Sequence, residues 1–569
     1  MEDTDMKKFK NLYTLAALLM AGAAITACTS DDLADEALAP QQGKTYTLSV
    51  NATKGADTRA LTENATDGSL TAAWNADDEV TVYKGETEVG TLKPTAAEAT
   101  KLQGEVTGVA ENDELTLKFQ ADADYTSQEG TLEYIDQHCS AAVATVTVTE
   151  IVGDAVTTSD ATFENQQSIT KFTFSETVSK VIISGGVQEI TVTPTQATAT
   201  LYVAMPATDE STDYIFSATV DGATYLGKKG VKLDNGKFYT AIIGLTSQTE
   251  YTDLSAEETA NTYMVTMAGK YKFKATVKGN GGIDPLTGTT ATTIDKSSIE
   301  GVKVLWELKE QGLAIKHDGT SYDIFYSDGY VYFSTPDELT SGDCYVAVYD
   351  SEDTILWSWL IWATVTPETT TYEELGIMDR NIGALNVNSD TYKAGFLYQW
   401  GRKDPFPAGT FFRQPTQYVF VPARTTALGY EEDNDGFTMA YSVAHPTTQL
   451  GPASACWLVE SEFTVNLWLS STGTKTIYDP CPAGWRIPTK DEISKVWSSG
   501  VTLPGGGSAA GNSRFEGYCN GGTPYYWTST AESRTDAWCC QSGTLKTANG
   551  NYYPDWRLSS AMSIRPVKE

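Results

Sequence analysis

The sequence predicts a mainly β protein built from several domains in a row. Its 569 residues exceed several times the roughly 100–200 residues of one domain. Between residues 44 and 247, short runs of alternating apolar and polar residues, rich in Val, Ile and Thr, are separated by Asp, Asn and Gly. That pattern is typical of β-sandwiches. The last 200 residues differ, because they hold eight of the thirteen tryptophans and long Gly-, Asn- and Pro-rich stretches.

The charge balance excludes one class of partner. The chain has 40 Lys and Arg against 74 Asp and Glu, a net charge of −34. Such a surface repels phosphate backbones, so we expect no nucleic-acid partner. We interpret the acidity as a solvated surface that keeps an exported protein soluble.

The first 27 residues have the features of a secretory signal peptide. Basic residues at Lys7, Lys8 and Lys10 precede an apolar segment that is shorter than the roughly 20 residues of a membrane-spanning helix. The segment ends in Ala27-Cys28 after small residues, which resembles the lipobox of bacterial lipoproteins. The resemblance implies that Cys28 is lipidated, becomes the mature N-terminus and attaches the protein to the outer membrane. The alternative is an ordinary signal peptide with a chance cysteine.

A strand is predicted between this anchor and a candidate cut site. Four apolar residues alternate with polar ones, as in a half-buried strand: Tyr46, Leu48, Val50 and Ala52. Arg59-Ala60 follows in a polar stretch and is a candidate protease site. Residues 28–59 would then form a lipidated propeptide whose strand is removed by cleavage. The alternative is that Arg59 is an ordinary surface arginine.

Residues 44 to about 247 carry a family resemblance. Segments 46–55, 58–61 and 74–83 resemble the N-terminal domain of the fimbrillin family, the pilus subunits of Bacteroidetes, and 236–240 is similar to the close of its second domain. The resemblance implies tandem β-sandwich domains at 60–165 and 166–247. It also implies assembly with other fimbrial subunits by β-strand addition, and a fimbrium on the cell surface.

We predict a third β-sandwich-like domain at 248–366. Strand-like runs recur there, and residues 355–362 contain Trp357, Trp359 and Trp362. Stacked indoles occur in carbohydrate sites, but core packing is the commoner use. We therefore expect these three side chains in the core.

The last part, 367–569, carries a second resemblance. Its segments 378–384, 398–406, 479–489, 526–529 and 563–567 resemble, in order, the Fibrobacter major paralogous domain family, which is similar to C-type lectin-like α+β domains. The resemblance implies a host or microbial glycan or protein ligand. The calcium-dependent sugar tripeptides Glu-Pro-Asn and Trp-Asn-Asp are absent. We interpret Arg380, Trp485 and Arg486 as structural.

No catalytic site or cofactor is predicted. Glu431, Asp433 and Asp435 match three EF-hand positions, but Ser442 occupies the place of the bidentate acid, which favours a solvated loop over a calcium site. Adjacent cysteines occur at 539–540 without a nearby histidine to activate them. Export permits structural disulfides, for which the candidates are Cys456, Cys481, Cys519, Cys539 and Cys540.

Two functions are compatible with these features. The first is an adhesive pilus subunit at the tip, since the second domain continues into about 320 more residues and leaves no free strand to donate. The segment 563–567 is a poor donor because Pro566 lacks an N–H group. The second is a surface lipoprotein that binds glycans or host proteins and never polymerises.

Overall fold

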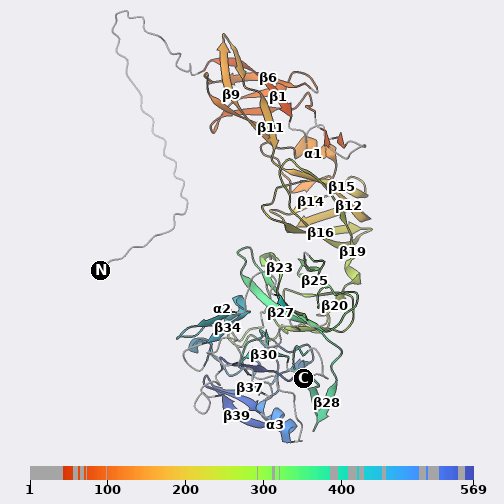
Figure 1. The fold of residues 1–569 in the computed structure, drawn as a ribbon, viewed down its shortest axis with the longest axis vertical. Coiled ribbons are helices and arrows are strands. Elements are labelled where there is room, and N and C mark those ends of the chain that lie inside the picture. Colours follow the sequence, from red (N-terminus) through yellow and green to blue (C-terminus); the bar gives the residue numbers. More distant parts are fainter. Residues whose placement is uncertain are drawn as a thin grey trace, which may run out of the picture.

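The fold is known from a computed structural model. It describes residues 43–54, 62–63, 70–71, 73–97, 99–290, 292–309, 314–319, 321–384, 395–407, 419–421, 429–451, 456–498, 508–509, 525–541, 543–548 and 558–569. Most of the regular structure is strand, which confirms the predicted mainly β fold. Figure 1 shows three bodies stacked along the long axis, which we call the first barrel (45–165), the second sandwich (166–247) and the C-terminal body (248–569).

The first barrel is one sheet that closes on itself. Its strand order is β10-β1-β11-β9-β7-β4-β5-β6, and β1 also pairs with β6. Alternating apolar residues fill the interior, where Trp74 packs edge-on against Phe119 and Phe163 at ring distances of 5.5 and 5.4 Å. The strands are β1 Thr45–Lys54, β4 Val80–Lys84, β5 Thr87–Pro94, β6 Lys101–Thr107, β7 Glu114–Phe119, β9 Ala142–Val152, β10 Ala155–Thr158 and β11 Ala161–Asn165.

A short helix and three small strands join the barrel to the second sandwich. Helix α1, Leu132–His138, begins where the Thr131 side chain accepts a hydrogen bond from the Tyr134 N–H. β8 (Ser127–Gln128) pairs with β14 of the sandwich, while β2 (Thr62–Glu63) and β3 (Leu70–Thr71) form a hairpin. The buried side chains of this junction are Leu70, Ile135, Cys139, Ile169 and Ala204.

The second sandwich packs a three-stranded sheet on a six-stranded one. β11 ends at Asn165 and β12 begins at Ser168, so the chain passes directly from barrel to sandwich. The smaller sheet has the order β15-β12-β18, with β12 Ser168–Val178, β15 Thr198–Met205 and β18 Phe238–Ile243. The larger has the order β19-β17-β16-β13-β14-β8, with β13 Lys180–Ser184, β14 Ile190–Val192, β16 Thr212–Val220, β17 Ala223–Val231 and β19 Thr246–Ser247.

The C-terminal body begins with two sheets. One has the order β20-β22-β25-β24, with β20 Thr252–Asp253, β22 Lys270–Lys274, β25 Tyr330–Ser334 and β24 Ile324–Ser327. The other has the order β21-β27-β26-β23-β32, with β21 Thr262–Val265, β27 Ile355–Ala363, β26 Gly342–Tyr349, β23 Gly301–Lys309 and β32 Val419–Val421. Short 3-10 turns are η1 Gln248–Glu250, η2 Lys296–Ser298 and η4 Glu460–Glu462.

The rest of this body consists of short strands and two helices. The strands are β28 Thr369–Tyr372, β29 Leu375–Met378, β30 Phe396–Gln399, β31 Phe406–Pro407, β33 Gly429–Glu432, β34 Thr448–Gly451, β35 Trp485–Arg486, β36 Ser508–Ala509, β37 Tyr525–Ser533, β38 Asp536–Gln541, β39 Thr544–Ala548, β40 Ala561–Ser563 and β41 Val567–Lys568. The helices are α2 Met439–Ala444 and α3 Lys490–Ser498. Thr489 and Glu492 cap α3 reciprocally. The lectin-like architecture stays a prediction.

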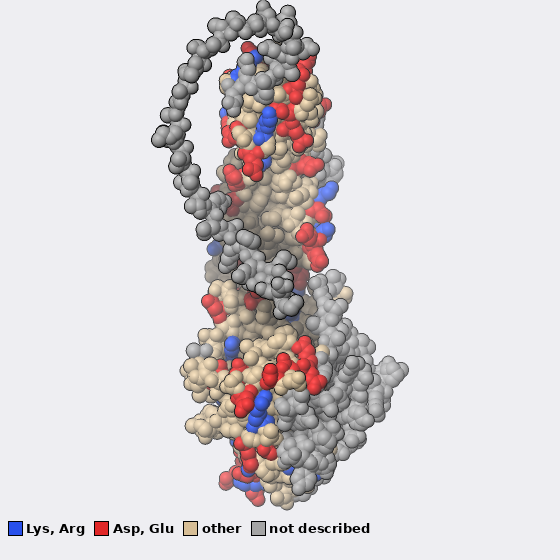
Figure 2. Space-filling view, turned by 90° about the vertical axis from the view of Figure 1, so that its left-hand side faces the viewer, with Lys and Arg blue, Asp and Glu red and all other residues tan. Residues whose placement is uncertain are grey.

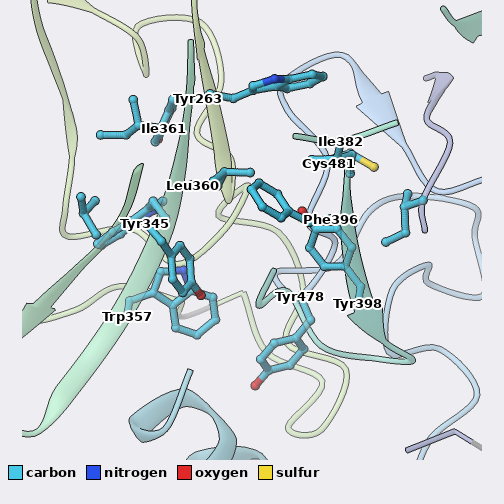
Figure 3. Close-up of a cluster of buried hydrophobic side chains, with 14 of the residues drawn as sticks. Tyr263, Tyr345, Trp357, Leu360, Ile361, Ile382, Phe396, Tyr398, Tyr478 and Cys481 are labelled. Carbon is cyan, nitrogen blue, oxygen red and sulfur yellow. The ribbon is translucent and has the colours of Figure 1, made fainter. Parts of the chain in front are cut away.

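One hydrophobic core runs through the whole C-terminal body. It contains residues on both sides of the predicted boundary between 366 and 367, and Figure 3 shows Tyr263 and Trp357 within the same cluster as Phe396 and Tyr478. Polar contacts join the two parts as well: the Asn261 side-chain amide donates to the carbonyl oxygens of Ile477 and Asp479 at 2.7 and 2.8 Å. Residues 248–366 and 367–569 therefore bury their apolar surface against each other.

The three tryptophans of β27 lie inside this core. Trp357, Trp359 and Trp362 are each at most 1% exposed, which confirms that they serve packing. Both faces of β27 are covered, because the consecutive residues 357–363, whose side chains point alternately to the two faces, are all buried. A glycan therefore has no access to the indoles.

We predict that Trp359→Ala lowers the free energy of unfolding of the C-terminal body by about 3–5 kcal/mol, because the substitution leaves a large cavity. Trp74 is the single tryptophan outside this body, so tryptophan fluorescence during denaturant unfolding reports mainly on it. Val365→Ala is the control: Val365 is 65% exposed, and its truncation should change stability by less than about 0.5 kcal/mol. Two separate fluorescence transitions within the body would contradict the shared core.

Candidate functional site

The first strand is paired along both of its edges. On one side β1 runs antiparallel to β6, from Thr45 opposite Thr107 to Asn51 opposite Lys101. On the other side it runs parallel to β10 at Thr47–Ser49 and then to β11 at Ala52–Lys54. β1 is thus the strand that closes the barrel.

The side chains of β1 alternate between the core and the solvent. Leu48, Val50 and Ala52 are at most 1% exposed and belong to the barrel core, and Tyr46 packs half-buried against it. Because side chains point alternately to the two faces of a strand, the residues between them face outward. Fully burying Leu48 and Val50 stabilises the barrel by about 1.5–3 kcal/mol each.

Removal of β1 would change the barrel in a defined way. The interior residues that pack against Leu48 and Val50 would line an open apolar groove. The backbone N–H and C=O groups of β6 on one wall, and of β10 and β11 on the other, would lose their partners. Such a groove is a template for a replacement strand.

The chain after β1 is held by the second sandwich rather than by the barrel. The described residues stop at Lys54 and resume at Thr62 in β2, where the Glu63 carboxylate accepts two hydrogen bonds of 2.8 Å from Lys171 Nζ and another from the Tyr202 hydroxyl. Leu70, in the paired strand β3, is buried in the junction core. The β2–β3 hairpin therefore stays attached to the sandwich whether or not β1 is present.

Hydrogen bonds shift the pKa values of two groups at this contact, which we call the Glu63 clasp (Glu63, Lys171 and Tyr202). The hydrogen bond from Lys171, followed by that from Tyr202, lowers the pKa of Glu63 below its ordinary value of 4.5. The same hydrogen bond raises the pKa of Lys171. Both groups are therefore charged at neutral pH.

The remaining predicted residues of the N-terminal segment lie outside the described residues. These are the lipidation candidate Cys28 and the cleavage candidates Arg59 and Ala60. Lipidation and cleavage there stay predictions.

The three residues of the C-terminal motifs that we interpret as structural are Arg380, Trp485 and Arg486. Arg380, 2% exposed, donates to its neighbour Asp379 and, at 2.7 Å, to the Thr364 hydroxyl. Trp485 lies in the core, and Arg486 pairs with Glu492 at 2.8 Å. These contacts agree with the structural interpretation of the three residues.

Arg402 is a buried side chain that binds several backbone carbonyl oxygens, and sequence reasoning did not single it out. It is fully buried and donates to the Asp404 carboxylate and to the carbonyl oxygens of Thr448, His445 and Ser442. Burial alone would raise the pKa of Asp404, but the charges of Lys403 and Arg402 outweigh it and hold that pKa below its usual range. The signal in the sequence was three consecutive charges, 402–404, inside an otherwise apolar and aromatic stretch.

Two acidic side chains of the candidate calcium loop accept hydrogen bonds from neighbouring groups. Glu431 accepts a hydrogen bond from the Tyr441 hydroxyl, while Asp433 accepts one from the Asp435 N–H. Within the described residues, no group of three or more His, Cys, Asp or Glu side chains could hold a metal ion.

Four of the five candidate disulfide cysteines are described, and they are buried thiols. Cys456, Cys481, Cys539 and Cys540 are all unpaired, and Cys519 lies outside the described residues. The candidate disulfides therefore stay a prediction. Neighbouring residues of β38 point to opposite faces, so Cys539 enters the main core and Cys540 a separate cluster with Ile493 and Tyr526. Burial raises the pKa of Cys540 to about 11 and that of Cys539 to about 12.

The last strand is enclosed by its neighbours. β41 lies between β29 and β35, and Val567 is fully buried. The adjacent Glu569 pairs at 3.1 Å with Lys475, which is 1% exposed at its side chain. Releasing β41 would break both a sheet and the ion pair of an exposed glutamate with a buried lysine.

The surface carries two further features. An open groove with a volume of about 2320 Å³ lies between the second sandwich and the C-terminal body, and Lys228, Tyr322 and Tyr349 are among its lining residues. Figure 2 shows Asp and Glu spread along one side of the molecule with fewer Lys and Arg between them. No helix in the described part of the chain has the length and apolar character needed to span a bilayer.

Comparisons with known proteins gave matches among solved structures alone. No family model and no curated protein matches the chain. A candidate cell adhesion protein from Bacteroides ovatus is similar at 12% identity and a TM-score of 0.24, covering 37% of this chain and 96% of that one. The tip fimbrial protein Mfa3 from Porphyromonas gingivalis is similar at 9% identity and a TM-score of 0.17, covering 34% of this chain and 81% of that one. A candidate polysaccharide-binding protein from Bacteroides thetaiotaomicron is similar at 12% identity and a TM-score of 0.18, covering 32% of this chain and 78% of that one.

We predict that Glu63→Gln destabilises the junction by about 1 kcal/mol at pH 7, because a charge-assisted contact becomes a neutral one. The pKa of Glu63 is lowered on folding, so its contribution is present above pH 4.5 and is lost as the pH falls below that value. The difference in melting temperature between the variant and the natural protein should therefore vanish in acid. Glu79→Gln, which breaks an exposed ion pair with Lys93, is the control and should have little effect at any pH.

Proposed function

We propose that the protein is an adhesive subunit of a cell-surface pilus, assembled by proteolysis-triggered strand exchange and positioned at the tip. The observation that carries the proposal is the place of β1: it closes the first barrel, and it lies in sequence between Cys28 and Arg59. The likeness of segments 46–55 and 74–83 to the fimbrillin family supports the same function.

Cleavage after Arg59 would turn β1 into a separate peptide. Noncovalent contacts alone would then hold it, and a strand from another subunit offering the same backbone hydrogen bonds and apolar side chains could replace it. Exchange avoids the cost of leaving both walls of the groove unpaired. The lipid on Cys28 would leave with the old strand.

The Glu63 clasp would hold the new N-terminal segment against the second sandwich after cleavage. The new N-terminus at Ala60 would lie three residues before Glu63, which stays bound to Lys171 and Tyr202. Loss of β1 therefore need not loosen the junction between barrel and sandwich.

The C-terminal half supports the position at the tip. A shaft subunit must donate a strand as well as accept one. Here the described C-terminal strand β41 is internal to its sheet and Glu569 pairs with Lys475. Extracting it would cost a large part of the 5–15 kcal/mol that stabilises a domain.

A second candidate function is a lipoprotein that stays on the outer membrane and binds glycans or host proteins. The groove between the second sandwich and the C-terminal body favours it, since lining by both aromatic and charged side chains suits a polar ligand. The mature N-terminus separates the two functions, because a permanently anchored receptor keeps Cys28.

We predict that mature protein isolated from cell-surface pili begins at Ala60, as N-terminal sequencing would show. Arg59→Ala should reduce incorporation into pili at least about tenfold, because the intact linker keeps β1 in its groove. Arg59→Lys distinguishes an arginine-specific protease from a trypsin-like one. Mature protein that begins at Cys28 would contradict the proposal.

We also predict that the protein decorates pilus ends. An antibody raised against the exposed strand β28, with its three solvent-facing threonines at 369–371, should label the distal ends in immunoelectron microscopy. A strain lacking the gene is the control for specificity. Labels spaced along the shaft, or polymers formed by this subunit alone, would refute the tip position.

A further inference from the structure

We infer that the groove beneath β1 selects its incoming strand by side-chain size and by one polar contact. The partner is a β-strand of another chain with a large aliphatic residue, a hydrogen-bond donor and a small residue at the positions of Leu48, Asn51 and Ala52. This inference rests on the proposed function and names the partner of that same site.

The position of Leu48 requires a large side chain. Leu48 pairs with Gly104 on β6 and with Val156 on β10. No side chain can be added at 104, because a Cβ atom there would lie 1.9 Å from the Thr91 carbonyl oxygen. On the β6 side of Leu48 the wall is therefore backbone, which cannot move to fill a gap, and the incoming strand must supply the missing volume.

The position of Ala52 requires a small side chain. Ala52 pairs with Ala161 on β11, and both side chains are buried at 1% exposure or less. The Ala52 N–H donates to the Thr100 carbonyl oxygen at 2.8 Å, which fixes the backbone at this end. A larger residue here would overpack a close-packed site.

A polar contact between these two positions sets the register. β10 ends at Thr158 and β11 begins at Ala161, so one wall of the groove is interrupted there. Asp160, in the interruption, accepts a hydrogen bond of 3.1 Å from the Asn51 side-chain amide. Asn51 faces outward, so a donor at its position is recognised without entering the core.

The three requirements together allow one register. A shift by one residue would turn the polar face of the strand into the core. For the sequence of β1, a shift by two would place Val50 or Lys54, both larger than alanine, opposite Ala161. Apolar alternation alone is therefore not sufficient for a strand to bind.

The test is peptide exchange on the full chain. A recognition sequence for a site-specific protease replaces residues 56–60, the protein is folded and then cut, and the displacement of the labelled fragment carrying β1 is followed by fluorescence anisotropy. The competing peptides span residues 44–54 in the natural sequence or with Leu48→Ala, Ala52→Leu, Asn51→Val or Thr47→Ala. Thr47 is exposed and faces outward, so Thr47→Ala is the matched control.

We expect the natural peptide to displace the fragment and Thr47→Ala to compete within about threefold of it. Leu48→Ala should compete at least about 30-fold less well, the loss expected for truncating a buried leucine. Ala52→Leu should lose about 5- to 150-fold through overpacking, and Asn51→Val a few fold.

Two outcomes are distinguishable. If no peptide, including the natural one, displaces the fragment, strand exchange and with it the proposed function is contradicted. If the natural peptide exchanges but Ala52→Leu or Leu48→Ala competes equally well, the groove binds any strand with alternating apolar residues. This inference is then wrong. The engineered cut makes both results independent of whether Arg59 is the natural cleavage site.

Discussion

The first barrel depends on the pairing of one strand with three others. β1 is the only element, among the described residues, that joins β6 to β10 and β11. Its buried residues and its two rows of backbone hydrogen bonds belong to the barrel, whereas the next described residues, in β2, belong to the second sandwich. The first passage of the chain from the barrel to the second sandwich thus falls between Lys54 and Thr62, the sequence interval that contains Arg59.

Local periodicity predicted the strands of the barrel and sandwich because each residue in them obeys the same alternation. Leu48, Val50 and Ala52 face the core as their spacing indicates, and Trp357, Trp359 and Trp362 are core residues as expected. Partners distant in sequence were not predictable. Nothing local to Glu63 indicates Lys171 and Tyr202, and nothing local to Asn261 indicates the carbonyl oxygens of Ile477 and Asp479.

The C-terminal half shows why composition is a weaker guide than periodicity. Its change in tryptophan content at about residue 367 suggested a separate domain, yet the indoles on both sides of that position share one core. The adjacent cysteines suggested partners in two separate disulfides, which stays a prediction; their alternation across β38 sends each to a different cluster. Arg402 was overlooked because its partners far away in the sequence are backbone carbonyl oxygens, which any sequence provides.

The orientation of β1 has a mechanical consequence. A strand that replaced it would run antiparallel to β6 and parallel to β10 and β11, with hydrogen bonds perpendicular to its length on the antiparallel side. Tension applied along such a strand shears the whole ladder at once instead of opening it one bond at a time. A joint of this geometry resists pulling forces, such as fluid flow over a surface to which a distal ligand is attached, far better than its equilibrium stability alone would indicate.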